Sequence, residues 1–213
     1  MITPRIKICG LKTPEALYAA VDARADFAGF VFFPPSPRHI NLRDAKALSE
    51  LAEGRIGRVG LFVDADDEAF AAAIAAANLD AIQLHGKETP ARTAQVKARF
   101  GLPVWKALPV RSAGDVERAE AYCEAADLIL FDAKTPDGAL PGGMGLTFDW
   151  NLVLGWKHRS GWGLAGGLTP DTVAGGIQQT AAPLVDTSSG VESAPGVKDV
   201  DKIAAFCEAA RSI

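Results

Sequence analysis

Short runs of apolar residues alternate with amphipathic stretches from one end of the chain to the other. A short apolar run is typical of a strand buried on both faces, whereas apolar residues spaced three or four apart favour a helix with one buried face. The pattern predicts strands at residues 6–9, 27–32, 58–63, 81–84, 104–107, 128–131, 163–165 and 184–186. It predicts helices at 15–23, 43–51, 68–76, 90–100, 114–125, 170–177 and 197–211, and a short helix at 150–154.

Several of these helices carry sequence signals at their starts. Thr13-Pro14, Thr89-Pro90 and Thr169-Pro170 each place an N-cap hydroxyl before a proline at the first helical position. Ser112 and Asp115 predict a similar start with different residue types.

Eight strand–helix alternations in 213 residues predict a (β/α)₈ TIM barrel, as a single domain over residues 1–213. An open doubly wound sheet is the alternative, although it would need fewer strands or an extra layer. A barrel also predicts the position of a functional site, because chemistry in this fold takes place in the loops after the C-terminal ends of the strands.

Composition excludes several classes of protein. Charged residues make up 23% of the chain and the net charge is −4, with no basic tract, so we do not expect a nucleic acid partner. Residues 1–5 form no apolar leader, and the longest apolar run, at 69–77, is too short to span a bilayer. The three cysteines are widely spaced and indicate a reducing cytoplasm, and the three histidines show no metal-ligand spacing, so no metal is expected.

Two residues at predicted strand ends form a candidate acid/base pair. Cys9 ends the first strand just before Gly10, and Asp132 ends the sixth, so a barrel would turn both toward one mouth. A thiolate and a carboxylic acid can exchange protons with a substrate. The alternatives are a buried apolar filler for Cys9 and a loop cap for Asp132, and the residues alone leave both open.

Two small-residue loops on neighbouring strands predict a phosphate site. Gly166 and Gly167 follow the seventh strand, and Ser188, Ser189 and Gly190 follow the eighth. Glycines let backbone N–H groups approach an anion, and barrels commonly bind phosphate after strands seven and eight. Tight turns are the alternative, but two such loops side by side favour phosphate.

Other strand-end residues are less informative. Arg38 follows three prolines and has the fork geometry for a carboxylate or phosphate, although a solvated loop arginine is an equal alternative. His85 is interpreted as a packed or hydrogen-bonded residue rather than a catalyst, and Asp64 is assigned no role. The segment 132–146 is rich in Gly and Pro, which is typical of a functional or mobile loop.

The motifs together resemble the phosphoribosylanthranilate isomerases of the tryptophan pathway. The matching strings occur in family order over almost the whole chain: Lys7-Ile8-Cys9-Gly10, Gly29-Phe30-Val31-Phe32 through Ser36-Pro37-Arg38, Val59-Gly60-Leu61-Phe62-Val63, Gln83-Leu84-His85-Gly86, Gly145 through Thr147-Phe148-Asp149-Trp150, Ala165-Gly166-Gly167-Leu168 and Ser188-Ser189-Gly190-Val191-Glu192.

The resemblance implies an Amadori rearrangement of N-(5-phosphoribosyl)anthranilate, a small sugar phosphate, with no cofactor. It implies that Asp132 is the general acid and Cys9 the general base. It also implies that Arg38 holds the anthranilate carboxylate and that the two small-residue loops hold the phosphate. We expect the chain to act as a monomer.

The sequence departs from the family pattern at three places: Thr187, Met144 and the insertion Ala139-Leu140-Pro141. These departures affect expectations for loop dynamics, not for the reaction. Two rival functions are a related histidine-pathway isomerase, which would need a second phosphate loop and an Asp in place of Cys9, and a non-catalytic phosphate-binding barrel.

Overall fold

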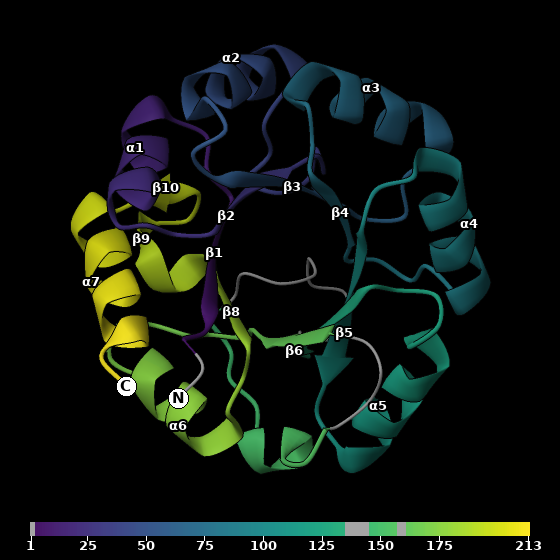
Figure 1. Cartoon of the computed structure of the whole chain (residues 1–213), viewed down its shortest axis with the longest axis vertical. Helices are drawn as coiled ribbons and strands as arrows, with labels where there is room; N and C mark the ends of the chain where they lie inside the picture. Colours follow the sequence, from purple (N-terminus) through teal and green to yellow (C-terminus); the bar gives the residue numbers. More distant parts are fainter. Residues whose placement is uncertain (1–2, 135–144, 157–160) are drawn as a thin grey trace.

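The strands form a closed parallel barrel. The computed structural model describes residues 3–134, 145–156 and 161–213. Each strand pairs with its neighbour in the sequence and the eighth pairs with the first, which confirms the (β/α)₈ barrel and excludes an open sheet (Figure 1). The strands are β1 Arg5–Cys9, β2 Phe27–Val31, β3 Gly57–Phe62, β4 Ala81–Leu84, β5 Val104–Val110, β6 Leu128–Ala133, β7 Gly161–Leu164 and β8 Leu184–Thr187.

A ring of helices surrounds this barrel (Figure 1). The α-helices are α1 Pro14–Asp22, α2 Leu42–Ala52, α3 Asp67–Ala77, α4 Pro90–Phe100, α5 Ala113–Arg118, α6 Val173–Thr180 and α7 Val200–Arg211. Short 3₁₀ helices are η1 Ala119–Tyr122, η2 Trp150–Val153 and η3 Ser189–Val191. Among the described residues, none of these helices has the length and apolar character needed to cross a membrane.

Most of the predicted helix starts are confirmed. The hydroxyls of Thr13 and Thr89 accept hydrogen bonds from the backbone at the starts of α1 and α4, and Ser112 forms a capping box with Asp115. The prediction of a helix start at Thr169-Pro170 is wrong. The Thr169 N–H donates to the Thr172 hydroxyl (3.0 Å) and the Thr172 N–H donates to the Thr169 carbonyl (3.1 Å). These bonds form a turn, and α6 begins only at Val173.

Several predicted element boundaries are also wrong. The last helix does not begin at residue 197, because β9 (Glu192–Ala194) and β10 (Val197–Lys198) first form a small antiparallel hairpin and Asp199 then caps α7. The predicted helix 114–125 is instead α5 followed by η1. Strands β5 and β6 extend past their predicted ends because they remain paired as far as Val110 and Ala133.

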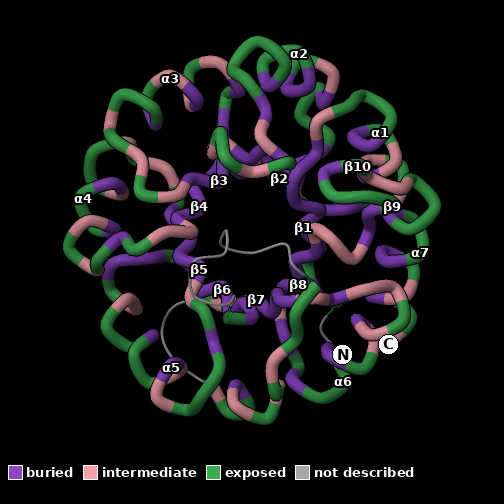
Figure 2. The backbone as a smooth tube through the Cα atoms, turned by 180° about the vertical axis from the view of Figure 1, so that it is seen from behind, coloured by how far each residue is buried: buried purple, intermediate pink, exposed green. Residues whose placement is uncertain are grey.

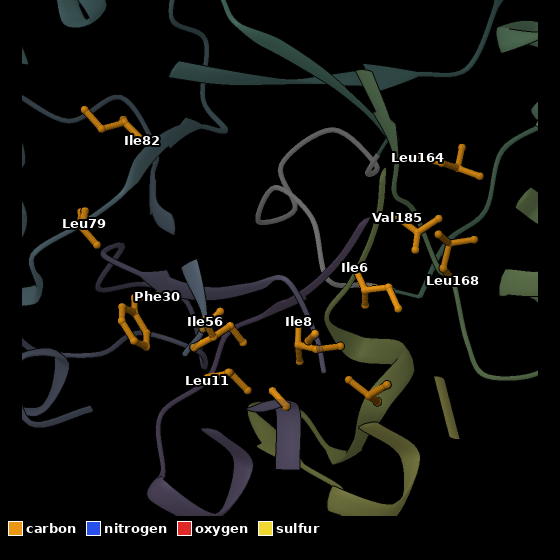
Figure 3. Packing of buried hydrophobic residues seen from close by; sticks show 14 of the residues in the cluster. Ile6, Ile8, Leu11, Phe30, Ile56, Leu79, Ile82, Leu164, Leu168 and Val185 are labelled. Carbon is orange, nitrogen blue, oxygen red and sulfur yellow. The ribbon is translucent and has the colours of Figure 1, made fainter. Parts of the chain in front are cut away.

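Strand alternation divides the core into two layers. Ile6 and Ile8 point outward from β1 and pack, with residues of β2, β7 and β8, against the helices (Figure 3). The residues that alternate with these outward-facing ones along each strand point into the barrel. There Val59 of β3, Trp105 of β5 and Leu130 of β6 belong to a separate apolar cluster. The strands are buried on both faces, whereas exposed residues concentrate on the outer helices and loops (Figure 2).

The N-terminal end of the barrel carries a repeated hydrogen bond. Asp26 lies just before β2, and its carboxylate accepts from the Ile6 N–H in β1 at 2.8 Å. Asp80 before β4 accepts from the Arg58 N–H at 2.7 Å, and Asp127 before β6 accepts from the Val104 N–H at 2.8 Å. Each carboxylate thus satisfies a strand N–H on the preceding strand, so this end of the barrel serves stability.

Replacing Asp26 with Ala should lower the free energy of unfolding by about 1 kcal/mol, because the Ile6 N–H loses its acceptor. Asp26→Asn keeps a side-chain oxygen and should lose much less. Urea unfolding of both variants measures the difference, and turnover per folded molecule should stay unchanged. Equal losses in the two variants would show that the hydrogen bond is not the stabilising feature.

Candidate functional site

A pocket lies at the C-terminal ends of the strands. All of the predicted site residues contribute to its wall: Cys9, Arg38, Asp132, Gly166, Gly167, Ser188, Ser189 and Gly190. They come from five different strand ends or strand-end loops, and the two catalytic candidates lie on different strands. The closed barrel therefore brings together residues that are far apart in the sequence, at the place that the fold predicts.

Asp132 is held in one orientation at the end of β6. Its Oδ1 accepts a hydrogen bond from the Ala133 N–H at 2.8 Å, and its Oδ2 lies 3.1 Å from Nε2 of His85. With the Gln83 amide oriented as in this structure, Gln83 Nε2 donates to His85 Nδ1 at 3.2 Å, which leaves the ring proton on Nε2. His85 is therefore hydrogen-bonded, as predicted, and its bond fixes the carboxyl group of Asp132.

Cys9 borders the pocket from β1 and is almost fully buried. The hydroxyl of Ser188 donates to the Cys9 carbonyl at 3.1 Å, so the thiol strand and the loop after β8 are joined directly. Burial raises the pKa of the Cys9 thiol above its ordinary value, and the nearby ammonium of Lys7 opposes that effect without cancelling it. Burial thus favours the neutral thiol form of Cys9 in the free protein.

A buried ion pair lies beside Cys9. Lys7 is 0% exposed, and its Nζ lies 3.0 Å from Oδ1 of Asp186 on β8. Burial disfavours charge on Lys7, but the pKa of the lysine is raised, because the Asp186 carboxylate and, when ionised, the Cys9 sulfur favour the ammonium. Burial also raises the pKa of the Asp186 carboxyl, although Lys7 acts in the opposite direction. The ammonium form of Lys7 is thus favoured inside the barrel.

The two small-residue loops need their glycines. Gly166 and Gly167 have positive φ values of 81° and 63°, and a Cβ on Gly166 would lie 2.6 Å from the Ala133 nitrogen. A Cβ on Gly190 would overlap the Leu168 carbonyl oxygen. The same carbonyl accepts a hydrogen bond from the Thr187 hydroxyl at 2.7 Å, so the unusual Thr187 joins the two loops.

Arg38 lies in a buried cluster of charges rather than in solvent. Its Nε and Nη2 donate to the two carboxylate oxygens of Glu192, each at 2.8 Å. Lys198 Nζ lies 2.8 Å from Oε1 of the same glutamate and also donates to the Ser188 carbonyl. Burial favours the neutral carboxyl group of Glu192, but the bonds from Arg38 and Lys198 prevail and lower its pKa. The side chain of Arg38 is therefore fixed where it borders the pocket.

Sequence reasoning missed Lys7, Asp186, Glu192 and Lys198. The signal for Lys7 was available, because it lies two residues before Cys9 in a strand and must point the same way. Asp186 was named only as a strand end. Glu192 stood in a family-matching string but was given no role, and Lys198 carried no local signal, because it lies on the β9–β10 hairpin that the sequence did not reveal.

The other two cysteines and Asp64 do not line the pocket, and some of the departures from the family pattern lie outside the described residues. Cys207 is buried on α7, where burial raises its pKa to about 11, and Cys123 is partly buried. The Asp64 carboxylate accepts a hydrogen bond from the Lys87 N–H, which joins the loop after β3 to the loop after β4. Met144 and the insertion at residues 139–141 fall outside the described residues.

Comparisons with known proteins all point to one family. The family model described as N-(5'-phosphoribosyl)anthranilate (PRA) isomerase matches residues 6–209. An N-(5'-phosphoribosyl)anthranilate isomerase from Erythrobacter litoralis is 52% identical over 207 residues, covering 97% of this chain and 98% of that protein. One from Paracoccus denitrificans is 54% identical over 202 residues, covering 94% of each chain.

Solved structures give the same result. The crystal structure of phosphoribosyl anthranilate isomerase from Thermotoga maritima has a TM-score of 0.88 and 38% identity, covering 99% of this chain and 100% of that one. A second isomerase structure, in complex with reduced 1-(o-carboxyphenylamino)-1-deoxyribulose 5-phosphate, has a TM-score of 0.86 and 36% identity with the same coverage.

Replacing Glu192 with Gln should lower the free energy of unfolding by about 3 kcal/mol at neutral pH, because two buried cations lose their carboxylate. The lowered pKa means that this stabilisation is complete above the ordinary glutamate value of 4.5. It is lost as the pH falls through the folded-state pKa, so the difference between variant and parent should shrink there.

Urea unfolding across this pH range measures the effect. Glu53→Gln is the matched control, because Glu53 forms only an exposed 4.0 Å pair with Arg55 and its removal should change stability little. A Glu192→Gln variant as stable as the parent at neutral pH would contradict the role assigned to this cluster.

Proposed function

The chain belongs to the N-(5'-phosphoribosyl)anthranilate isomerase family and is an isomerase of tryptophan biosynthesis, and we propose that Cys9 is its general base and Asp132 its general acid. The reaction is the Amadori rearrangement of N-(5-phosphoribosyl)anthranilate to 1-(2-carboxyphenylamino)-1-deoxyribulose 5-phosphate. The observation that carries the proposal is the presence of both residues, from β1 and β6, in the wall of one pocket.

In the first step Asp132 donates a proton to the ribose ring oxygen. The bond between this oxygen and C1 breaks, and the nitrogen lone pair forms a C1=N bond, which gives an open-chain Schiff base with a positive charge. The orientation of Asp132 by His85 and the Ala133 N–H supports this role, because a general acid must be held within hydrogen-bond reach of its target.

In the second step the Cys9 thiolate removes the proton from C2. The electron pair of the broken C2–H bond forms a C1=C2 bond and neutralises the nitrogen, which gives an enolamine that tautomerises to the ketone. The positive Schiff base makes the C2 proton more acidic and stabilises a nearby thiolate. Because the pKa of Cys9 is raised in the free protein, kcat/KM should rise with pH on the alkaline side.

The ends of the substrate carry negative charge, and the pocket offers suitable groups for both. We assign the phosphate to the loops at Gly166, Gly167 and 188–190, where glycine backbone and serine hydroxyls line the pocket. We assign the anthranilate carboxylate to Arg38, which Glu192 holds against the pocket. A substrate anchored at both ends places its reacting carbons between Cys9 and Asp132.

The rival functions are less well supported. The family match over residues 6–209 argues against a histidine-pathway isomerase. A non-catalytic phosphate-binding barrel would not need a thiol and an oriented carboxyl group in the same pocket. The expected monomer stays a prediction, which sedimentation of the purified chain tests.

Cys9→Ala and Asp132→Asn should each lower kcat by roughly 10²- to 10⁴-fold, the usual contribution of a general base or acid. The assay is the loss of anthranilate fluorescence from freshly generated phosphoribosylanthranilate. Cys123→Ser is the control, because Cys123 follows η1 and is not part of the pocket wall, so its activity should match the parent. Unchanged turnover in Cys9→Ala or Asp132→Asn would overturn the assignment.

Ser189→Ala should weaken competitive inhibition by inorganic phosphate about tenfold, because a hydroxyl that donates to a charged oxygen contributes more than a neutral hydrogen bond. The value of kcat should change little. Ser193→Ala, on the β9–β10 hairpin, is the control. If both variants bind phosphate like the parent, the phosphate does not contact Ser189.

A further inference from the structure

The placement of Lys7 gives it a direct relation to Cys9. The two residues are separated by one position in β1, and alternate residues of a strand point to the same face. Ile6 and Ile8 point outward to the helices, so Lys7 and Cys9 both point into the barrel. A fully buried lysine is unusual, and this one lies one layer below the thiol that borders the pocket.

A second strand fixes the ammonium group of Lys7. The pairing of β1 with β8 sets Lys7 directly opposite Asp186, and Nζ lies 3.0 Å from the carboxylate. Asp186 also contributes to the pocket wall, whereas its partner is covered completely. The ion pair therefore connects the floor of the pocket to the interior of the barrel.

A third strand, β2, leaves space for the side chains of Lys7 and Cys9 to lie close together. Gly29 on β2 pairs with Cys9, and a Cβ on Gly29 would lie 3.0 Å from the Cys9 sulfur and 3.2 Å from Cε of Lys7. The sulfur and the end of the lysine chain thus border the same small volume, which any side chain larger than hydrogen would fill. The absence of a side chain at residue 29 keeps thiol and ammonium together.

We propose that Lys7 is a positioning residue for Cys9, whose ammonium, held by Asp186, stabilises the thiolate that removes the C2 proton. This inference rests on the proposed function of Cys9. Lys7 itself touches no substrate in this account, because it is covered by the residues of the pocket floor.

Several charged groups near Cys9 raise or lower the pKa of its thiol. Lys7 has the largest influence that lowers the pKa of the thiol, Lys198 on β10 has a smaller one, and Asp186 on β8 raises it. Arg38, His85 and Asp132 also face the pocket. Burial outweighs the cations in the free protein, so Lys7 limits a rise that would otherwise be larger.

Opposite shifts in two variants test the proposal. Lys7→Met should move the midpoint of Cys9 ionisation to higher pH by roughly one unit or more, because a cation is lost. Asp186→Asn should move it to lower pH, because an anion that opposes the thiolate is lost. The midpoint is measured on the full-length protein, from the pH dependence of iodoacetamide alkylation at the Cys9 peptide by mass spectrometry.

Two controls show whether a shift in the Cys9 midpoint reflects the loss of Lys7 rather than a general change in the structure. Cys123 in the same samples should keep its midpoint. Lys106→Met removes another buried lysine, which pairs with Glu88 at 3.1 Å, and should leave Cys9 unchanged. Lys7→Met leaves the Asp186 charge buried without its cation, so the double variant Lys7→Met/Asp186→Asn restores neutrality and should have a midpoint between those of the single variants.

Shifts in the same direction for Lys7→Met and Asp186→Asn, or no shift in either, would overturn the proposal. The pH profile of kcat/KM should follow the alkylation midpoints if Cys9 is the base. If the midpoints shift as expected while Cys9→Ala retains full activity, the coupling is real and the proposed function of Cys9 is wrong, so the two failures are distinguishable.

Discussion

The pairing of β8 with β1 is the constraint on which the site depends. It closes the barrel, sets Lys7 opposite Asp186 and brings the loop at Ser188 against the Cys9 carbonyl. Residues 179 positions apart in the sequence thereby become hydrogen-bonded neighbours. The thiol, the proposed phosphate loop and the buried ion pair are consequences of one strand pairing, and a shift of that register by one residue would turn each inward side chain outward.

The C-terminal end of the barrel and its loops hold buried charges, whereas the cluster of Val59, Trp105 and Leu130 inside the barrel is apolar. Each buried lysine near the rim has a carboxylate partner: Lys7 has Asp186, Lys106 has Glu88 and Lys198 has Glu192. Charges removed from water cost stability unless they are paired and hydrogen-bonded. The pairs of Lys7 and Lys198 also involve residues beside the pocket, because Asp186 lines it and Glu192 holds Arg38. Preorganisation of this kind lets a site stabilise charge that develops during a reaction without reorienting its own dipoles.

The barrel could be predicted from the sequence, and every predicted site residue lines the pocket, because both depend on local patterns. Apolar periodicity located every strand of the barrel, and chemistry-bearing residues stood at strand ends. The failures have physical causes. The hydroxyl-bonded turn at Thr169 replaced an expected helix start, and the β9–β10 hairpin depends on contacts that no short window contains. The pair of Lys7 with Asp186 required the barrel to be closed before its register could be known.

A crystal structure of this chain with reduced 1-(o-carboxyphenylamino)-1-deoxyribulose 5-phosphate, the ligand seen in a solved relative, tests the account most directly. We expect the phosphate on the loops at Gly166, Gly167 and 188–190 and the carboxylate at Arg38. The Cys9 sulfur should lie about 3–3.5 Å from C2, a distance suited to reaction. A complex in which C2 faces away from Cys9, with Asp132 remote from the sugar oxygens, would contradict it.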